Sequence, residues 1–160
     1  MKFVLILWLS VSLVSGCGVY SFSSSSLGGV KTVAIPQFEN KSLEYGIQED
    51  LTAKVVEKFL ADNTLKVVGL ADADAVLRGE VVKYERVPYT YDKSETVSEY
   101  KVNIYVNFVL ERKGGKAMLE KSNMLGFGTF SATTGSEDDG KKQAIDQLAR
   151  DIVDETTKTW

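Results

Sequence analysis

Residues 100–110 place the strongest constraint on how this chain can fold. Apolar and mostly polar side chains alternate there without a break, which is the pattern of a β-strand with one buried face and one solvent-facing side. The apolar positions are Tyr100, Val102, Ile104, Val106, Phe108 and Leu110. A strand of this kind needs other strands beside it and a second layer over its apolar face, so the rest of the chain must supply both.

Four further strands are predicted, at residues 30–35, 65–68, 75–87 and 117–130. The apolar phase of residues 75–87 changes at Val81 and Val82, which predicts a bulge or a strong twist. A Gly-Gly turn precedes residues 117–130, so this segment is expected to return beside residues 100–110 as a hairpin. Gly126 and Gly128 thin that strand and favour a bulge or a close approach of another backbone.

Two amphipathic helices are predicted to form the second layer. The first begins near residues 42–44, after a loop at residues 38–42, and ends at about residue 61. The second begins at Ser136, where Asp139 completes the spacing of a capping box, and continues close to the C-terminus. The resulting order is βαββββα. It predicts an α+β two-layer sandwich, in which one twisted mixed β-sheet carries both helices on one face.

The N-terminus has the layout of a secretory signal. One positive charge at Lys2 precedes an apolar run that ends in Val14, Ser15, Gly16 and Cys17, and this ending resembles the lipobox of bacterial lipoproteins. The resemblance implies that residues 1–16 are removed and that Cys17 is lipidated. Residues 17–29 then form a Ser/Gly-rich tether, and residues 30–160 form a single α+β domain. The alternative is an unpaired thiol beside an ordinary cleavage site.

The position after the cysteine bears on localisation. In many envelopes an Asp at this position retains the lipoprotein at the inner membrane, and here the residue is Gly18. The lipobox resemblance therefore implies a lipid anchor on the periplasmic face of the outer membrane. With two or more acyl chains such an anchor is stable, and the protein is attached to the membrane without spanning it.

The composition excludes several classes of function. Without residues 1–16 the chain has 18 basic and 22 acidic side chains, so its charge of −4 gives no general attraction for nucleic acid. The sequence has no histidine and its one cysteine is Cys17, which excludes a Ser-His-Asp triad, a Cys-His nucleophile and a His or Cys zinc site. An enzyme would have to rely on carboxylates, Lys or Tyr. With this alternative left open, we expect no enzyme activity, no cofactor and no metal site.

Three phrases in the sequence are similar to one family. They are residues 31–40 (KTVAIPQFEN), 73–80 (ADAVLRGE) and the tyrosine-rich residues 84–91 (YERVPYTY). In this order, together with the lipobox, they resemble the divergent branch of the LPS-assembly lipoprotein family LptE, over nearly the whole mature chain. The resemblance implies a plug and assembly subunit of the large outer-membrane β-barrel, of the LptD type, that inserts lipopolysaccharide into the outer leaflet. It also implies contact with lipopolysaccharide itself.

A second function class shares part of this evidence. Residues 33–40 are also similar to the opening strand of envelope adaptor lipoproteins of the curli-export or TolB N-terminal type, which oligomerise. Recovery of a one-to-one complex with a barrel, as opposed to a ring of this chain alone, distinguishes the two classes.

Two groups of residues are candidate binding sites. Four basic residues around the Gly-Gly turn could bind lipopolysaccharide phosphates, with a solvated hairpin tip as the alternative; they are Arg112, Lys113, Lys116 and Lys121. The tyrosines around Pro88 are expected on a loop that contacts the barrel lumen, with capping of the sheet end as the alternative. These tyrosines are Tyr84, Tyr89, Tyr91 and Tyr100.

The acidic groups have simpler explanations. Asp72 and Asp74 could form half of a calcium site, but they fit a polar loop that leads into a strand. The acids at residues 137–139 suit the first turn of a helix better than a pair of catalytic carboxylates.

Overall fold

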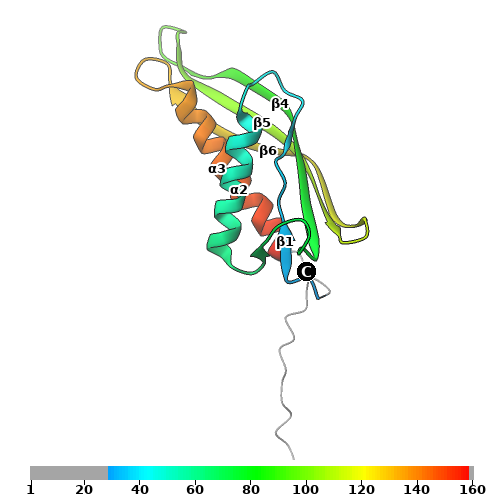
Figure 1. Ribbon diagram of the computed structural model, residues 1–160. Coiled ribbons are helices and arrows are strands. Elements are labelled where there is room, and N and C mark those ends of the chain that lie inside the picture. The colour runs from blue at the N-terminus through cyan, green and yellow to red at the C-terminus, as the bar shows by residue number, and fades with distance from the viewer. Residues whose placement is uncertain (1–28, 159–160) are drawn as a thin grey trace, which may run out of the picture.

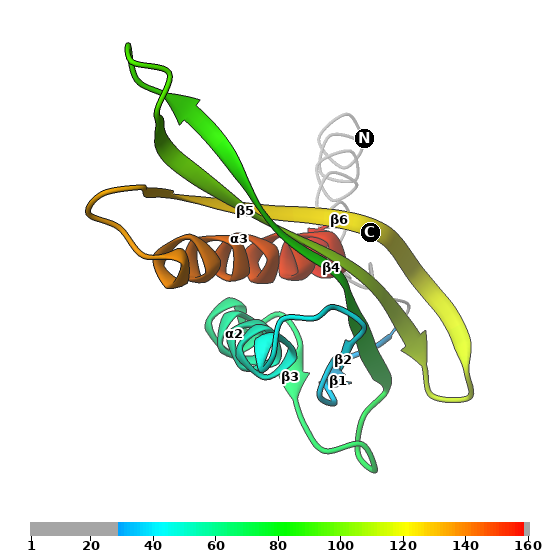
Figure 2. The same ribbon diagram turned by 90° about the horizontal axis from the view of Figure 1, so that it is seen from above.

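A computed structural model describes residues 29–158, in which a strongly twisted sheet carries two helices on one side (Figures 1 and 2). The predicted signal, Cys17 and nearly all of the predicted tether lie outside the described residues. The predictions for these segments therefore remain predictions.

The sheet has six strands in the order β3-β1-β4-β5-β6, with β2 paired to β4. The strands are β1 (Thr32–Ala34), β2 (Glu39–Asn40), β3 (Lys66–Val67), β4 (Ala75–Tyr91), β5 (Val97–Arg112) and β6 (Lys116–Ser131). Pairing is parallel from β1 to β3 and β4 and from β2 to β4, whereas β4, β5 and β6 are antiparallel. The sheet is therefore mixed, with short parallel strands on one side and long antiparallel strands on the other.

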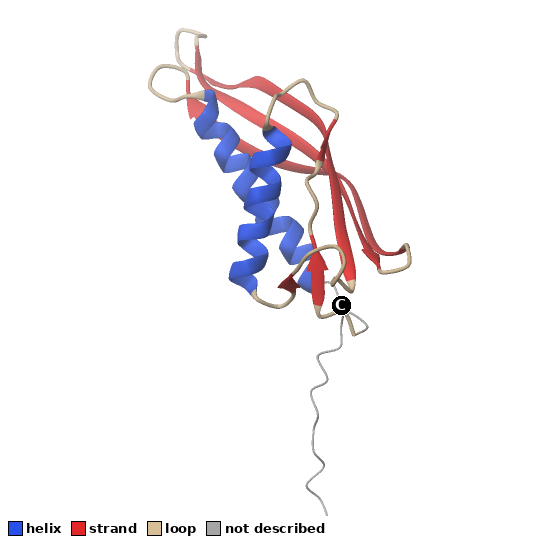
Figure 3. Ribbon diagram, in the orientation of Figure 1, coloured by secondary structure: helices blue, strands red, loops and turns tan. Residues whose placement is uncertain are grey.

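The helices are α2 (Ile47–Asp62) and α3 (Glu137–Lys158), drawn in blue in Figure 3. Their apolar stripes and the apolar face of β5 meet in one core, which includes Leu51, Phe59, Ile104, Leu148 and Ile152. The capping box predicted for α3 is present: the Asp139 backbone N–H donates to Ser136 Oγ at 3.2 Å, and the Ser136 backbone N–H donates to Asp139 Oδ2 at 3.0 Å. The α+β fold with both helices on one face is confirmed.

Two details of the predicted order are wrong. Residues 39–40, expected in a loop, form β2, because Glu39 pairs with Glu80 and the chain stays beside β4. Helix α2 begins at Ile47, not at residues 42–44. Gly46 holds the left-handed conformation immediately before the helix, with φ of 80°, and so separates residues 41–45 from it.

The long strands also exceed their predicted ranges. Strand β4 extends through Pro88 to Tyr91, so the segment expected as a tyrosine-bearing loop is a strand with register shifts near Pro88 and Thr90. The bulge expected at Val81 and Val82 is present, as a register shift between Val81 and Lys83. The actual loop of this hairpin is limited to residues 92–96.

Glycines let α3 lie directly on β6. A Cβ added at Gly128 would come within 2.1 Å of the Gly140 carbonyl oxygen, and one at Gly126 within 2.6 Å of the Ala144 carbonyl oxygen. The close approach predicted from these glycines is therefore real, and the approaching backbone belongs to α3. Because the helix is so close, its glutamines reach the outer backbone of β6: the Phe127 and Thr129 N–H groups donate to the side chains of Gln147 and Gln143.

Candidate functional site

The turn between β5 and β6 gathers three of the four predicted basic residues. Arg112 pairs with Lys116 across the turn, and Lys113 follows Arg112. The turn is attached to the loop before β4, because the Lys113 backbone N–H donates to the Asp74 carbonyl at 2.8 Å and its Nζ donates to the Ala71 carbonyl at 3.1 Å. All three basic side chains are exposed. We call Arg112, Lys113 and Lys116 the basic turn.

The basic turn lies beside the start of the described chain. Gly29, Val30, Asp74, Arg112 and Lys113 line a shallow hollow of about 250 Å³. If the predicted tether precedes residue 30, it enters the domain next to these cations. The basic turn is therefore at the end of the domain where the described chain begins.

Lys121 does not join the basic turn. It pairs with Phe108, whose side chain is buried on the helix side of the sheet, and its Nζ forms an ion pair of 2.6 Å with Glu155 of α3. A register shift between Val106 and Phe108 changes which residues of β6 face the helices. The predicted group of four is thus a group of three and a separate strand–helix ion pair.

Asp74 holds the start of β1. Its Oδ2 accepts hydrogen bonds from the Lys31 and Thr32 backbone N–H groups at 3.0 Å each and from Thr32 Oγ1 at 2.9 Å. The Lys31 backbone N–H, followed by Thr32, lowers the pKa of this carboxyl group. Within residues 29–158, no group of three or more acidic or thiol side chains is placed to hold a metal ion. Asp74 thus has a structural task at the start of β1.

The four tyrosines are divided between two surfaces. Tyr84 is half-buried, and its hydroxyl donates to Glu137 Oε1 at 2.6 Å, while Arg86 binds Glu137 Oε2 at 3.0 Å. Burial raises the pKa of the Tyr84 phenol, and the hydrogen bond to Glu137 adds to this shift. Tyr100 stacks on Phe130, with ring centroids 5.6 Å apart. Tyr84 and Tyr100 therefore join the sheet to α3 and to the end of β6.

Tyr89 and Tyr91 are exposed. The Lys101 ammonium lies 5.5 Å from the Tyr89 ring centroid and 4.5 Å from that of Phe127, so one cation contacts two exposed aromatic rings. Lys101 alternates with Val102, which is buried in the core, so the Lys101 side chain is on the opposite face of β5, which no described helix covers. Tyr89 belongs to the same side.

This helix-free side of the sheet is a second candidate surface. Leu125 pairs with Tyr105 and is 38% exposed, and Phe127 pairs with Asn103 and is 42% exposed. We call Tyr89, Lys101, Tyr105, Leu125 and Phe127 the open-face strip. The sequence analysis did not single out Leu125 and Phe127. A signal was present, because they alternate with Gly126 and Gly128, which puts the two large apolar side chains on the face opposite to the glycines.

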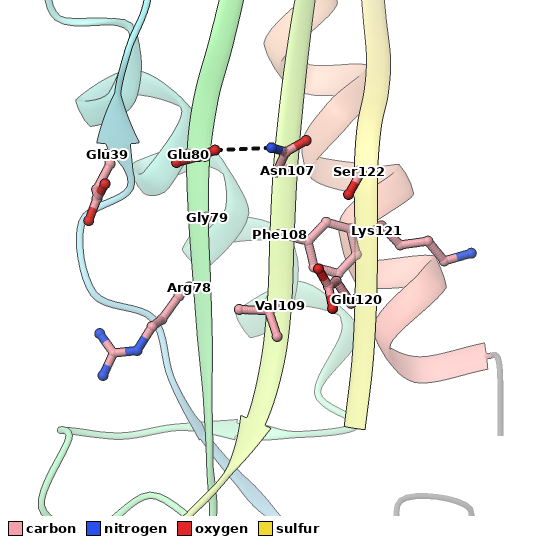
Figure 4. A pocket seen from close by; sticks show the side chains of 10 residues that line it. All are labelled: Glu39, Arg78, Gly79, Glu80, Asn107, Phe108, Val109, Glu120, Lys121 and Ser122. Carbon is pink, nitrogen blue, oxygen red and sulfur yellow. Dashed lines mark hydrogen bonds between the residues drawn. The ribbon is translucent and has the colours of Figure 1, made fainter. Parts of the chain in front are cut away.

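A shallow hollow of about 260 Å³ lies further along the same side of the sheet (Figure 4). Glu80 accepts a hydrogen bond from Asn107 Nδ2 at 3.0 Å and forms an ion pair with Lys41. Lys41 first, and Asn107 second, lower the pKa of Glu80, so this carboxylate is ionised at neutral pH. The hollow therefore presents charged and polar groups for contact.

Among the described helices, none is both long and apolar enough to span a membrane. The comparison with curated proteins gave no match. A family model described as "LptE: Lipopolysaccharide-assembly" matches residues 30–156.

Solved structures with a similar fold come from several bacteria. A hypothetical protein from Chlamydia trachomatis is 10% identical, with a TM-score of 0.59, and the match covers 79% of this chain and 95% of that one. For a protein from Xanthomonas campestris the identity is 13%, the TM-score 0.56 and the coverage 79% and 83%. For a minor lipoprotein from Acinetobacter baumannii these values are 20%, 0.52, 79% and 90%. At these identities the likeness concerns the fold.

Proposed function

The chain belongs to the lipopolysaccharide-assembly family LptE, and from this premise we propose that it is the plug and assembly subunit of a large outer-membrane β-barrel. In this proposal Cys17 carries the lipid anchor, the domain lies at the periplasmic face of the outer membrane, and the barrel, of the LptD type, inserts lipopolysaccharide into the outer leaflet. The protein has a structural role and no catalytic one. The family match over residues 30–156 is the observation that carries the proposal.

The open-face strip supports contact with a large protein surface. Tyr89, Leu125 and Phe127 are exposed, and Lys101 and Tyr105 are half-buried between them. They lie on a broad sheet whose described helices are all on the other side. Tyrosine and phenylalanine bury large areas with few rotatable bonds, which makes them effective interface residues. The family match does not favour the alternative, an oligomeric adaptor of the curli-export or TolB N-terminal type.

The basic turn supports contact with lipopolysaccharide. Arg112, Lys113 and Lys116 are exposed, and a guanidinium and two ammonium groups suit phosphate oxygens. Lys121 is a weaker candidate, because its ammonium is paired with Glu155 of α3 and lies apart from the turn. The proposal therefore assigns the lipid phosphate contact to the basic turn.

The complex is tested by mild-detergent purification of the tagged, lipidated chain from native outer membranes. We expect one large barrel protein in one-to-one ratio. A Cys17→Ser variant, which cannot be acylated at that position, is the control for the anchor and should leave the membrane fraction. Recovery of this chain alone, as a homo-oligomer, would sink the proposal.

The ligand contact is tested by charge reversal. The Arg112→Glu, Lys113→Glu and Lys116→Glu triple variant should bind purified lipopolysaccharide more weakly, while its far-UV circular dichroism is unchanged. Lys142→Glu is a matched control, because Lys142 is an exposed cation on α3 away from the turn. Equal binding by the triple variant and the wild type would remove these residues from the site.

A further inference from the structure

The loop between β2 and α2 exposes two large apolar side chains. Leu43 is fully exposed and Tyr45 is 94% exposed, the highest values among the exposed large hydrophobic side chains of the described chain. Residues 41–46 alternate strictly between exposed and half-buried positions. Ser42 and Glu44 occupy the half-buried positions, so this loop turns polar side chains inward and apolar ones outward, which reverses the usual arrangement.

Hydrogen bonds hold the reversed loop in place. Asn40 Oδ1 accepts from the Ser42 backbone N–H at 2.9 Å and from Ser42 Oγ at 2.7 Å. Asn40 Nδ2 donates to the Glu44 carbonyl at 2.7 Å. The Glu44 carboxylate forms an ion pair with Lys141 of α3. Leu43 and Tyr45 are therefore presented by a loop that is fixed from both sides, and little conformational entropy remains to be lost when a partner binds.

The position of the loop separates it from the predicted anchor. Helix α2 runs from the loop to β3, which pairs with β1 near the start of the described chain. With 16 residues it is about 24 Å long, so the loop and residue 30 lie at opposite ends of this helix (Figure 1). The loop therefore lies at the end of α2 opposite to the end of the domain where the described chain begins, to which the predicted tether would attach.

The charges around the loop disfavour an anionic ligand. Glu49 and Asp50, in the first turn of α2, are exposed. The inward-facing Glu44 is paired with Lys141, and Lys41, the cation within the loop, is paired with Glu80. Phosphate groups of lipids or of lipopolysaccharide would meet like charges here, whereas a protein pocket with an apolar floor and a basic rim would be complementary.

We propose that residues 41–46 form a docking loop whose Leu43 and Tyr45 side chains insert into an apolar pocket of the barrel protein. This inference rests on the proposed function, since it names the segment of this chain that contacts the barrel at the end of the domain away from the predicted anchor. Two neighbouring apolar anchors on a preorganised loop are the arrangement from which interface hot spots are built.

The test compares two pairs of exposed residues in the full lipidated chain. The Leu43→Ser and Tyr45→Ser double variant should recover at least roughly tenfold less barrel in mild-detergent purification, a change that corresponds to about 1.4 kcal/mol of binding. The control is Leu60→Ser with Leu70→Ser, because these leucines are more than half exposed outside the docking loop. The control should recover as much barrel as the wild type, and thermal unfolding of both double variants should match the wild type.

A photoreactive amino acid at position 43 or 45 gives an independent readout. We expect crosslinks to the barrel from these two positions and none from positions 60 and 70. Undiminished recovery of the barrel by the docking-loop variant would overturn the inference and leave the proposed function standing, as would crosslinks to lipid or to a second copy of this chain. A wild-type protein that recovers no barrel would overturn the proposed function itself, and this inference with it.

Discussion

The two faces of β5 carry residues from the same stretch of sequence and have different surroundings. On the covered face, Ile104 and Leu110 are fully buried beneath the helices. On the open face, which no helix of residues 29–158 covers, Asn103 is nevertheless only 8% exposed, because Glu85 and Phe127 flank it on the neighbouring strands. Its Nδ2 donates to Glu85, while its Oδ1 has no hydrogen-bond partner within the described residues.

This comparison separates two kinds of burial. The covered face is buried between layers and its side chains hold the fold together. The open face is partly shielded by its own neighbours, and it leaves Leu125 and Phe127 on the surface. Stability should therefore depend on the first face, and association with a partner on the second.

The largest effect is expected from a leucine of the covered face. Leu110→Ala should lower the free energy of unfolding by roughly 2–5 kcal/mol, because it removes buried methyl groups and leaves a cavity. Leu125→Ala on the open face should cost less than about 1 kcal/mol. Urea unfolding of both variants measures the difference, and equal losses would show that the two faces are equally important for stability.

A second test concerns how closely the covering layer approaches. Gly128→Ala should cost about 1–3 kcal/mol, because the new Cβ meets the Gly140 backbone and the helix must shift. Gly69→Ala is the matched control, since no atom lies within 4 Å of a Cβ built there. Thermal unfolding compares the two, and a neutral Gly128→Ala would mean that α3 is not held against β6 as described.

A third test concerns the polar link between β4 and α3. Tyr84→Phe should cost about 1 kcal/mol at neutral pH, because one hydrogen bond to Glu137 is lost. Since the pKa of Tyr84 is raised in the folded protein, its contribution is complete below the ordinary phenol pKa of about 10 and declines as the pH rises above it. The stability gap between wild type and variant should therefore narrow above about pH 10, and a constant gap would contradict this.

The smallest effect on stability is expected at the open-face strip. Phe127→Ser should change the free energy of unfolding by about 0.5 kcal/mol. The same variant should reduce recovery of the barrel, because an exposed aromatic ring would be lost from the contact surface. Unfolding in urea together with co-purification separates the two readouts. A loss of stability without a loss of recovery would assign Phe127 to the fold.

The sequence predicted the fold well because periodicity reports burial between layers. The alternation of residues 100–110 fixed the covered face, and the stripes of both helices agreed with it. The start of α2 was misplaced because Ser42, with Glu44 two residues later, has the composition of a helix start, although Gly46 ends the loop in a conformation that few other residues adopt. Two local signals compete here, and Gly46 decides where the helix begins.

The candidate sites were harder to predict because they depend on register. Arg112, Lys113 and Lys116 follow each other around a turn and stay together, whereas a register shift moves Lys121 toward α3. The tyrosines appeared as one cluster in the sequence, but Tyr84 and Tyr89 point to different sides of the sheet. A shift of one residue in a strand reverses every side chain after it, and composition does not report it.

The glutamines that reach over β6 have a consequence for self-association. An edge strand of 16 residues would ordinarily be a template for a strand from another molecule. Gln147 and Gln143 occupy the N–H groups of Phe127 and Thr129, and Gln143 also donates to the Thr129 carbonyl at 3.1 Å. The helix thus provides the hydrogen bonds that an incoming strand would offer, so that part of the edge is closed to domain swapping and fibre growth.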